Sequence, residues 1–349
     1  MPSRVYLDWN ATAPLRPEAR AAMAAAMDVV GNPSSVHAEG RAAKGLIERA
    51  RAQVAAALGA DGAEVIFTSG ATEAAALALA GRGLQGAPVE HDAVRAWIDP
   101  VLAVDAGGQV RVPDPARATV QLANSETGVV QAALPQGLAL CDMTQGFGKL
   151  PVAFNWLGCD AALVSAHKLG GPKGVGALVL RRGLDVDAQL RGGGQEMGRR
   201  AGTENVIGIA GFGAAAEAAG RDLANGMWDE VAEVRNILEK ALDAGAPATI
   251  FIGNSGPRLP NTLCFAAAGW KAETQVMAMD LAGFAVSAGS ACSSGKLRAS
   301  PVLGAMGHGP AVAAAALRVS LGPGVGRDDV LRFAEAWLRE ERRFRARAA

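Results

Sequence analysis

Two basic side chains stand where a strand-like run ends in glycines, in DAALVSAHKLGGPKGVGALVL at residues 160–180. Loops at strand ends commonly hold ligands, so His167 and Lys168 are candidates for chemistry. Desolvation and the neighbouring His167 would favour the uncharged, nucleophilic form of the Lys168 amine. The alternative is a lysine that extends from a strand edge into solvent.

Lysine is scarce in this chain, with seven lysines against 27 arginines, so few residues can serve as a deprotonatable amine. The other lysines lie in charged helices, polar loops or proline-containing turns, and none closes an apolar strand: Lys44, Lys149, Lys173, Lys240, Lys271 and Lys296. Lys149 and Lys173 are assigned to the turns. Lys168 is therefore the favoured amine.

A carboxylate accompanies this lysine. Asp142 follows the apolar run LALC, and Gln145 lies one loop step further. Because the carboxyl ends of parallel strands meet at one edge of a sheet, we expect Asp142 and Lys168 to share that edge.

The stretch FTSGATEA has a shape that suits a phosphate group, because a strand ends in a Ser-Gly turn and opens a helix. The free amides of Ala71 and Thr72 and two hydroxyls would bind a phosphate dianion. The alternative is that Ser69 and Thr72 only cap the helix. A Schiff-base lysine, a strand-end aspartate and a phosphate site at a helix N-terminus are together the three anchors that pyridoxal phosphate needs.

One of the four cysteines differs from the others in its surroundings. Cys292 lies in the Gly/Ser-rich stretch AVSAGSACSSGK, which predicts an accessible loop and a usable thiol. The other three, in apolar context, are predicted to pack in the core: Cys141, Cys159 and Cys264. Their scattered spacing favours neither a zinc site nor a disulfide framework.

The elements that position these residues follow from the pattern of the chain. Apolar runs of strand length alternate with Ala-rich helical stretches, which predicts helices packed on a mostly parallel sheet. Residues 203–245 are expected to be helical almost throughout, and a second, smaller α/β unit follows. A last helix should begin near Asp328, and the arginines after Glu341 are expected to form a solvated tail.

Composition limits the classes of partner. The 349 residues are half hydrophobic and carry 34 basic and 34 acidic side chains. No global field therefore favours nucleic acid or an anionic membrane. No basic, apolar leader or spanning segment is evident, so we expect a cytoplasmic protein with a small molecule or another protein as partner.

The chain resembles the cysteine desulfurases of the class V aminotransferase superfamily. The matching blocks are YLDWNATAPLRPEA, GNPSSVHAEGR, VIFTSGATEAAALAL, VEHDAV, NSETGVVQ, CDMTQGFGKLP, SAHKLGGPKGVGAL, GGGQEMGRRAGTEN, SAGSACSSGKL and LRVSLG. The resemblance implies the α/β fold of pyridoxal-phosphate transferases (fold type I). We expect a large cofactor-binding domain at residues 14–225 and a small domain of residues 1–13 and 226–349 that carries the cysteine loop.

The resemblance also implies roles around the cofactor, pyridoxal 5′-phosphate. Lys168 would carry it as a Schiff base and shuttle the α-proton of the substrate. His91 would stack on the ring, with a helix cap or a core residue as its alternative. Asp142 would keep the ring nitrogen protonated, and Gln145 and Ser125 would lie at the phenolic oxygen. The phosphate would be held by four residues: Ala71, Thr72, Ser165 and His167.

Further implied roles concern the substrate and the partners. Arg318 and Asn124 are similar to residues that bind the substrate, with a salt bridge beneath the small domain as the alternative for Arg318. Cys292 matches the cysteine that takes the sulfur of L-cysteine as a persulfide and releases alanine, for transfer to an acceptor such as an iron–sulfur scaffold. Thr203 resembles a residue that reaches the phosphate of the opposite subunit, which implies a homodimer.

Two departures from the family pattern stand out. Ser125 replaces an asparagine that binds the phenolic oxygen, which predicts an altered pKa of the lysine–cofactor link. The connection at residues 128–138 is too short for the usual helix, so that helix is expected to be shrunken or absent. Alternatives to a desulfurase are a class V aminotransferase, a selenocysteine lyase, or a non-catalytic scaffold relative.

Overall fold

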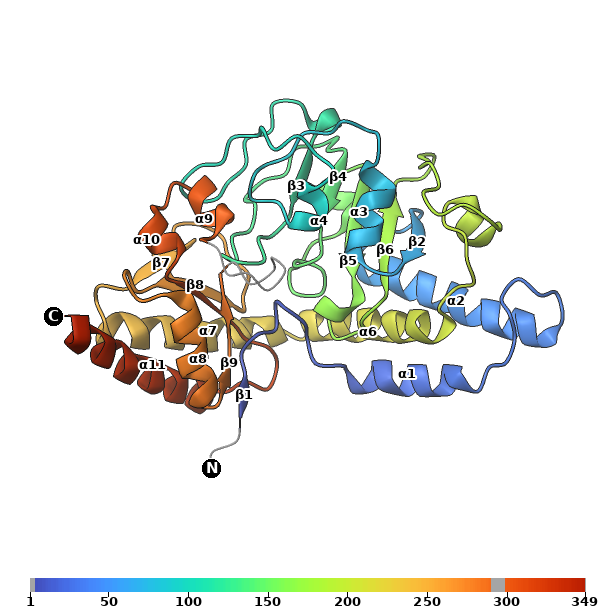
Figure 1. Cartoon of the computed structure of the whole chain (residues 1–349). Helices are drawn as coiled ribbons and strands as arrows, with labels where there is room; N and C mark the ends of the chain where they lie inside the picture. Colours follow the sequence, from blue (N-terminus) through green and yellow to red (C-terminus); the bar gives the residue numbers. More distant parts are fainter. Residues whose placement is uncertain (1–3, 290–298, 349) are drawn as a thin grey trace.

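A five-stranded sheet forms the centre of the larger part of the molecule (Figure 1), in a computed structural model that describes residues 4–289 and 299–348. Its strand order is β2-β6-β5-β4-β3. The strands are β2 (Glu64–Thr68), β3 (Thr119–Gln121), β4 (Leu140–Asp142), β5 (Ala161–Ser165) and β6 (Gly176–Leu180). Only β6 runs against its neighbours, so the other four share one direction. The predicted α/β class with a mostly parallel sheet is confirmed.

Helices cover both faces of this sheet. On one face lie α1 (Pro17–Met27), α2 (Ala38–Ala57) and α6 (Val206–Ala224), and on the other lie α3 (Ala71–Leu79) and the short α4 (Asp92–Arg95). Side chains that alternate along β2 explain the two layers: Val65 and Phe67 pack in the cluster of α2 and α6, whereas Ile66 packs in the cluster of α3. The short helices are η1 (Pro115–Arg117), α5 (Phe154–Leu157), η2 (Ala166–Lys168) and η3 (Gln195–Gly198).

A second, antiparallel sheet has the order β10-β11-β8-β7. Its strands are β7 (Ile250–Ile252), β8 (Thr262–Ala266), β10 (Ser287–Ala288) and β11 (Ala316–Ser320), and β1 (Val5–Tyr6) pairs separately with β9 (Phe284–Ala285). The other helices here are α7 (Met227–Gly245), α8 (Ala272–Leu281), α9 (Pro301–Ala305), α10 (Pro310–Ala313) and α11 (Arg327–Ala348). A separate buried cluster centred on Phe265, Phe333 and Trp337 joins β8 to α11.

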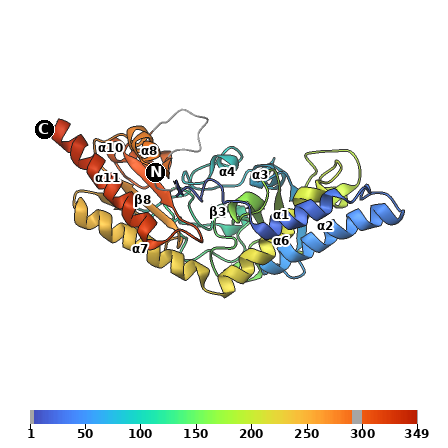
Figure 2. The same cartoon turned by 90° about the horizontal axis from the view of Figure 1, so that it is seen from below.

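The helical region expected at residues 203–245 is confirmed as α6 and α7, which follow one another closely along one side of the molecule (Figure 2). They meet at Asn225 and Gly226, next to the predicted division of the large and small domains. The division itself stays a prediction. Within the described part of the chain, no helix is long and apolar enough to span a bilayer.

The connection from β3 to β4 contains no helix over residues 122–139, as predicted. A turn after Asn124 replaces it and reaches the second sheet region, where the Val130 amide donates to the Pro257 carbonyl at 2.9 Å. The turn therefore ties Ser125 to both halves of the structure.

The arginines after Glu341 are exposed, as expected of a solvated tail, but α11 continues through them and does not end before them. Charge pairs at helical spacing explain the difference. Arg343 bonds Glu340 at 2.8 Å and Arg345 bonds Glu341 at 2.7 Å. Cys141, Cys159 and Cys264 are buried free thiols, which confirms their predicted place in the core.

Candidate active site

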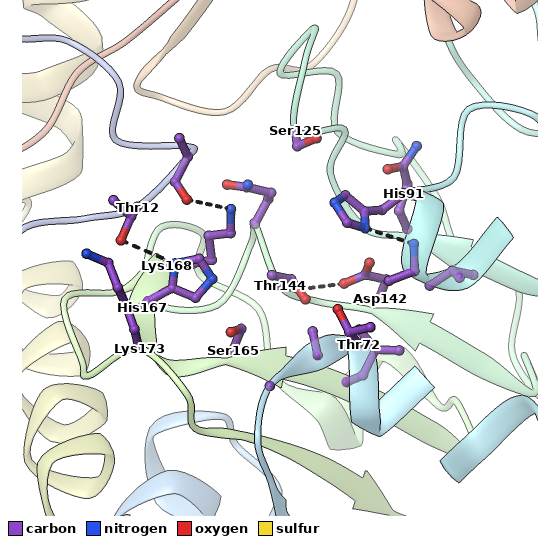
Figure 3. Close-up of a pocket in the computed structure, with 18 of the residues that line it drawn as sticks. Thr12, Thr72, His91, Ser125, Asp142, Thr144, Ser165, His167, Lys168 and Lys173 are labelled. Atoms are coloured by element: carbon purple, nitrogen blue, oxygen red, sulfur yellow. Dashed lines mark hydrogen bonds between the residues drawn. The ribbon is translucent and has the colours of Figure 1, made fainter. Parts of the chain in front are cut away.

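A cavity of about 540 Å³ opens at the carboxyl edge of the five-stranded sheet. Nine of the predicted site residues line it: Ala71, Thr72, His91, Ser125, Asp142, Gln145, Ser165, His167 and Lys168. Figure 3 shows Lys168 and His167 on one side of the cavity and His91, Asp142 and Thr72 on the other. Because β2, β4 and β5 run in the same direction, their carboxyl ends deliver these residues to one place, as expected.

Lys168 ends the short helix η2, directly after β5. Its Nζ donates to the main-chain oxygens of Asn10 at 2.7 Å and Ala11 at 2.9 Å. These carbonyls belong to the segment between β1 and α1, which crosses the edge of the sheet. The amine is thus held at the wall of the cavity by neutral acceptors.

The N-terminus of α3 faces the same cavity. Its N-cap is Gly70, and no side chain caps it, so the alternative in which Ser69 or Thr72 caps the helix is wrong. First-turn amides therefore have no side-chain acceptor and suit an anion. The backbone packs tightly here, since a Cβ on Gly176 would lie 2.6 Å from the Gly70 Cα. Glu73, in the first turn, is paired with Arg200 at 2.8 Å.

His167 contributes a neutral ring to this end of the cavity. Burial, together with the positive charges of Lys168, Lys173 and Lys149, lowers the pKa of His167 to about 4. Its Nδ1 lies 3.2 Å from the Thr12 hydroxyl. At neutral pH the ring can therefore offer a hydrogen bond without adding a charge.

His91 is the N-cap of α4, so the capping role expected as its alternative is observed. Its Nδ1 accepts from the Ala93 amide at 3.1 Å. In the neutral ring this acceptor role places the proton on Nε2. The cap thus fixes the tautomer of a ring that lines the cavity, and the two roles are compatible.

Asp142 ends β4 and is buried. Its Oδ1 accepts from the Thr144 amide at 2.9 Å, which fixes the carboxylate at the cavity wall. Gln145 follows in the same turn, and its Nε2 donates to the Asn10 carbonyl at 3.0 Å. The predicted acid and amide therefore lie on one short segment whose side chains are held by hydrogen bonds.

Three predicted residues lie outside the cavity lining. Arg318 is 1% exposed and donates to Asp8 at 2.7 Å and to the Ser125 carbonyl at 3.0 Å. This is the salt bridge expected as its alternative, and direct substrate binding by Arg318 stays a prediction. Asn124 is buried, and its Oδ1 accepts from the amides of Glu126 and Thr127 at 2.9 and 2.8 Å. Thr203 is exposed.

Cys292 lies at residues 290–298, outside the described residues. The described positions on either side, Gly289 and Pro301, line a smaller cavity with His91 and Ser125, which also line the main cavity. Described residues on either side of positions 290–298 therefore lie next to the predicted site.

Two buried carboxyl groups line this smaller cavity. Burial raises the pKa of Glu90 well above its ordinary value and raises that of Glu126 from 4.5 to about 7. A Ser300 hydrogen bond and the Arg318 charge oppose the shift at Glu126. One oxygen of each group, Glu90 Oε2 and Glu126 Oε1, has no hydrogen-bond partner among the described residues.

Replacing Glu126 by glutamine is expected to change how stability depends on pH. The folded pKa of Glu126, about 7, lies above the unfolded value of 4.5. The protonated carboxyl group therefore contributes to the free energy of unfolding at low pH, and this contribution is lost as pH rises through 7. From about pH 5 to about pH 8.5, wild type should lose about 2–3 kcal/mol relative to Glu126→Gln. Urea unfolding of both proteins at both pH values measures this. Parallel changes in the two proteins would contradict it.

The sequence interpretation missed Asn10, Thr12 and Lys149. Lys149, assigned to a turn, is a buried residue at 2% exposure whose Nζ donates to Gln145 Oε1 at 2.9 Å. The spacing of four residues between Gln145 and Lys149 was the available signal, because such pairs face each other when the chain coils. Asn10 and Thr12 lie in the N-terminal block YLDWNATAPL, which carried no expected role.

Comparison with known proteins agrees with this geometry. The profile described as "Aminotransferase class-V" matches residues 5–94 and 113–333, so the chain belongs to that family. Within it, a cysteine desulfurase from Klebsiella pneumoniae is 41% identical over 350 residues, covering 91% of this chain and 88% of its own length.

Solved structures give the same result. The X-ray structure of a NifS-like protein from Rickettsia africae matches with a TM-score of 0.87 at 30% identity, over 97% of this chain and 99% of its own. A structure described as SspA in complex with cysteine matches with a TM-score of 0.75 at 26% identity, over 91% of this chain and 99% of its own. Their agreement over nearly the whole chain supports one common fold.

Proposed function

We propose that this protein is a cysteine desulfurase that uses pyridoxal 5′-phosphate to take sulfur from L-cysteine. The observation that carries the proposal is the convergence of an amine, Lys168, a buried carboxylate, Asp142, and the uncapped N-terminus of α3 on one cavity. These residues fit the cofactor: a primary amine for its aldehyde, a carboxylate for its ring nitrogen, and free amides for its phosphate. The cysteine-bound SspA structure supports L-cysteine as the substrate.

The cofactor, when bound, supplies an electron sink that makes the α-proton of an amino acid removable. Lys168 Nζ holds the cofactor and then carries that proton. Asp142, fixed by the Thr144 amide, keeps the proton on the ring nitrogen. His91 would present Nε2–H toward the ring, and the amides of Ala71 and Thr72, with Ser165 and His167, would bind the phosphate. Gln145 and Ser125 would bind at the phenolic oxygen.

Cys292 supplies the sulfur-accepting group in this proposal. Its thiolate attacks the sulfur of the bound substrate, so the carbon–sulfur bond breaks as a sulfur–sulfur bond forms. The substrate carbon takes a proton and leaves as L-alanine, while Cys292 keeps the sulfur as a persulfide. No outside oxidant is needed, because the electron pair of the broken bond stays with carbon.

We infer further partners of the protein from the proposed desulfurase function. A sulfur acceptor, for which an iron–sulfur scaffold is the favoured class, would receive the persulfide sulfur. A homodimer would bring Thr203 to the phosphate of the other subunit. Arg318 would bind the substrate carboxylate once Asp8 releases it, and Asn124 would also bind the substrate. We place the protein in the cytoplasm.

Purified protein supplied with pyridoxal phosphate and L-cysteine tests the proposal. We expect a visible absorbance band from the bound cofactor and alanine formed together with sulfide in the presence of a reductant. Transfer of an amino group to a keto acid without sulfide would favour an aminotransferase, and activity on selenocysteine alone would favour a lyase. A scaffold relative would show neither absorbance nor alanine.

A further inference from the structure

A second lysine is buried beside the cavity without lining it. Lys149 Nζ donates to Gln145 Oε1 at 2.9 Å and to Asn10 Oδ1 at 3.3 Å. Both acceptors are uncharged amide oxygens. Burial, with the nearby positive charges of Lys168 and Arg318, lowers the pKa of Lys149 to about 7. A buried amine whose partners are uncharged destabilises the folded protein, so we expect Lys149 to have a function.

The Gln145 amide faces Lys149 with its oxygen. In its charged form Lys149 only donates hydrogen bonds, so that form favours this orientation of the amide. The amide nitrogen then points away from Lys149, and one of its hydrogens goes to the Asn10 carbonyl at 3.0 Å. Its second hydrogen remains for the cavity that Gln145 lines. Without Lys149 the amide could turn and present an oxygen to a cofactor oxygen that needs a donor.

Asn10 connects this pair to the reactive amine. Its main-chain oxygen accepts from both Gln145 Nε2 and Lys168 Nζ, the latter at 2.7 Å. Its side chain accepts from Lys149 and from Asn261, and donates to the Ser125 carbonyl at 3.2 Å. One buried residue thus receives hydrogen bonds from both lysines and from the amide between them.

We propose that Lys149 is a positioning residue that acts with Asn10 to hold the Gln145 amide with its nitrogen toward the phenolic oxygen of the cofactor. The proposal rests on the proposed function, since it presupposes pyridoxal phosphate in the cavity. It assigns Lys149 no contact with substrate.

A double-mutant cycle tests the inference, with Lys149→Met, Gln145→Met and the double variant. The readout is the dissociation constant of pyridoxal phosphate, measured by titrating the apoprotein. If Lys149 acts through Gln145, each single change should weaken binding by about tenfold and the double variant by about the same factor. The proposal would be overturned if the factors by which the two single changes raise the dissociation constant multiply in the double variant. It would also be overturned if Lys149→Met has no effect on that constant.

A spectroscopic readout separates positioning from a purely structural role. The pH midpoint of the visible absorbance of the holoenzyme should move by about half a unit or more in Lys149→Met. Lys240→Met, the same change at an exposed position on α7, should leave the midpoint in place. An unmoved midpoint in Lys149→Met would also overturn the proposal.

Two controls keep the outcome interpretable. Removing a buried charge is not expected to unfold the chain, and thermal unfolding of each variant verifies this. If Lys149→Met nevertheless fails to fold, Lys149→Gln retains a donor and should bind the cofactor more tightly than Lys149→Ala; equal binding would count against the proposal. Failure of wild type to bind the cofactor would refute the proposed function, whereas normal wild-type binding with an unaffected Lys149→Met would refute only this inference.

Discussion

Cys292→Ala is expected to lower alanine formation from L-cysteine by at least ~10⁴-fold, the scale on which removal of a nucleophile acts. The substitution removes the thiolate that takes the sulfur and leaves the residues that line the cavity unchanged. The visible absorbance of the bound cofactor should therefore match that of wild type. A spectrum and a quantitative alanine assay on the same preparation measure both quantities.

A matched cysteine variant sharpens this test. Cys159 is buried, and burial raises its pKa to about 12, so its thiol is a poor nucleophile. Cys159→Ala should keep most of the activity, with only a modest loss of stability from the smaller side chain. If Cys292→Ala keeps more than about a tenth of the wild-type rate, the desulfurase mechanism is wrong and an aminotransferase, which has no use for this thiol, becomes the better reading.

Asp142→Ala should lower kcat by about 10²–10³-fold. The substitution leaves the protonated ring nitrogen in a buried site without its counter-charge, and breaking a buried pair costs about 3–5 kcal/mol. KM for L-cysteine should change far less than kcat, because Asp142 is not expected to touch the substrate. Steady-state kinetics with saturating cofactor measures the two parameters separately.

Asp160 provides the control for Asp142. It precedes β5 at the opposite, amino end of the strand, pairs with Arg181 at 2.8 Å, and does not line the cavity. Asp160→Ala also removes an aspartate carboxylate, but from the other end of the strands, and should leave kcat within about twofold of wild type. Equal losses in the two variants would mean that Asp142 acts on stability and not on the cofactor.

The sequence was most informative at strand ends. Asp142 and Lys168 each follow an apolar run, and the shared direction of β4 and β5 brings them together whatever the details of the loops. The same logic held for the turn before α3. The placement of these residues depends on the local hydrophobic pattern and on the rule that parallel strands end at the same edge of a sheet. Both can be inferred from the sequence.

Contacts between side chains far apart in the sequence could not be predicted in the same way. Arg318 meets Asp8, 310 positions away, and this contact depends on how β1 and β11 are placed by the whole fold. Lys149 lies in a segment whose residue types predict an exposed turn. Its burial depends on tertiary packing, which the local sequence does not show. Asn124 shows a third limit, because the sequence did not indicate that its side chain would hold its own turn by hydrogen bonds. Its role in binding the substrate stays a prediction.

Borohydride reduction of the cofactor-loaded protein, followed by peptide mapping, identifies the amine that holds the cofactor. Reduction fixes the cofactor on the amine that holds it, and we predict the pyridoxyl group on the peptide containing Lys168. Its presence on Lys149, whose lowered pKa also makes it a candidate nucleophile, or on Lys173, or its absence from every peptide, would contradict the account.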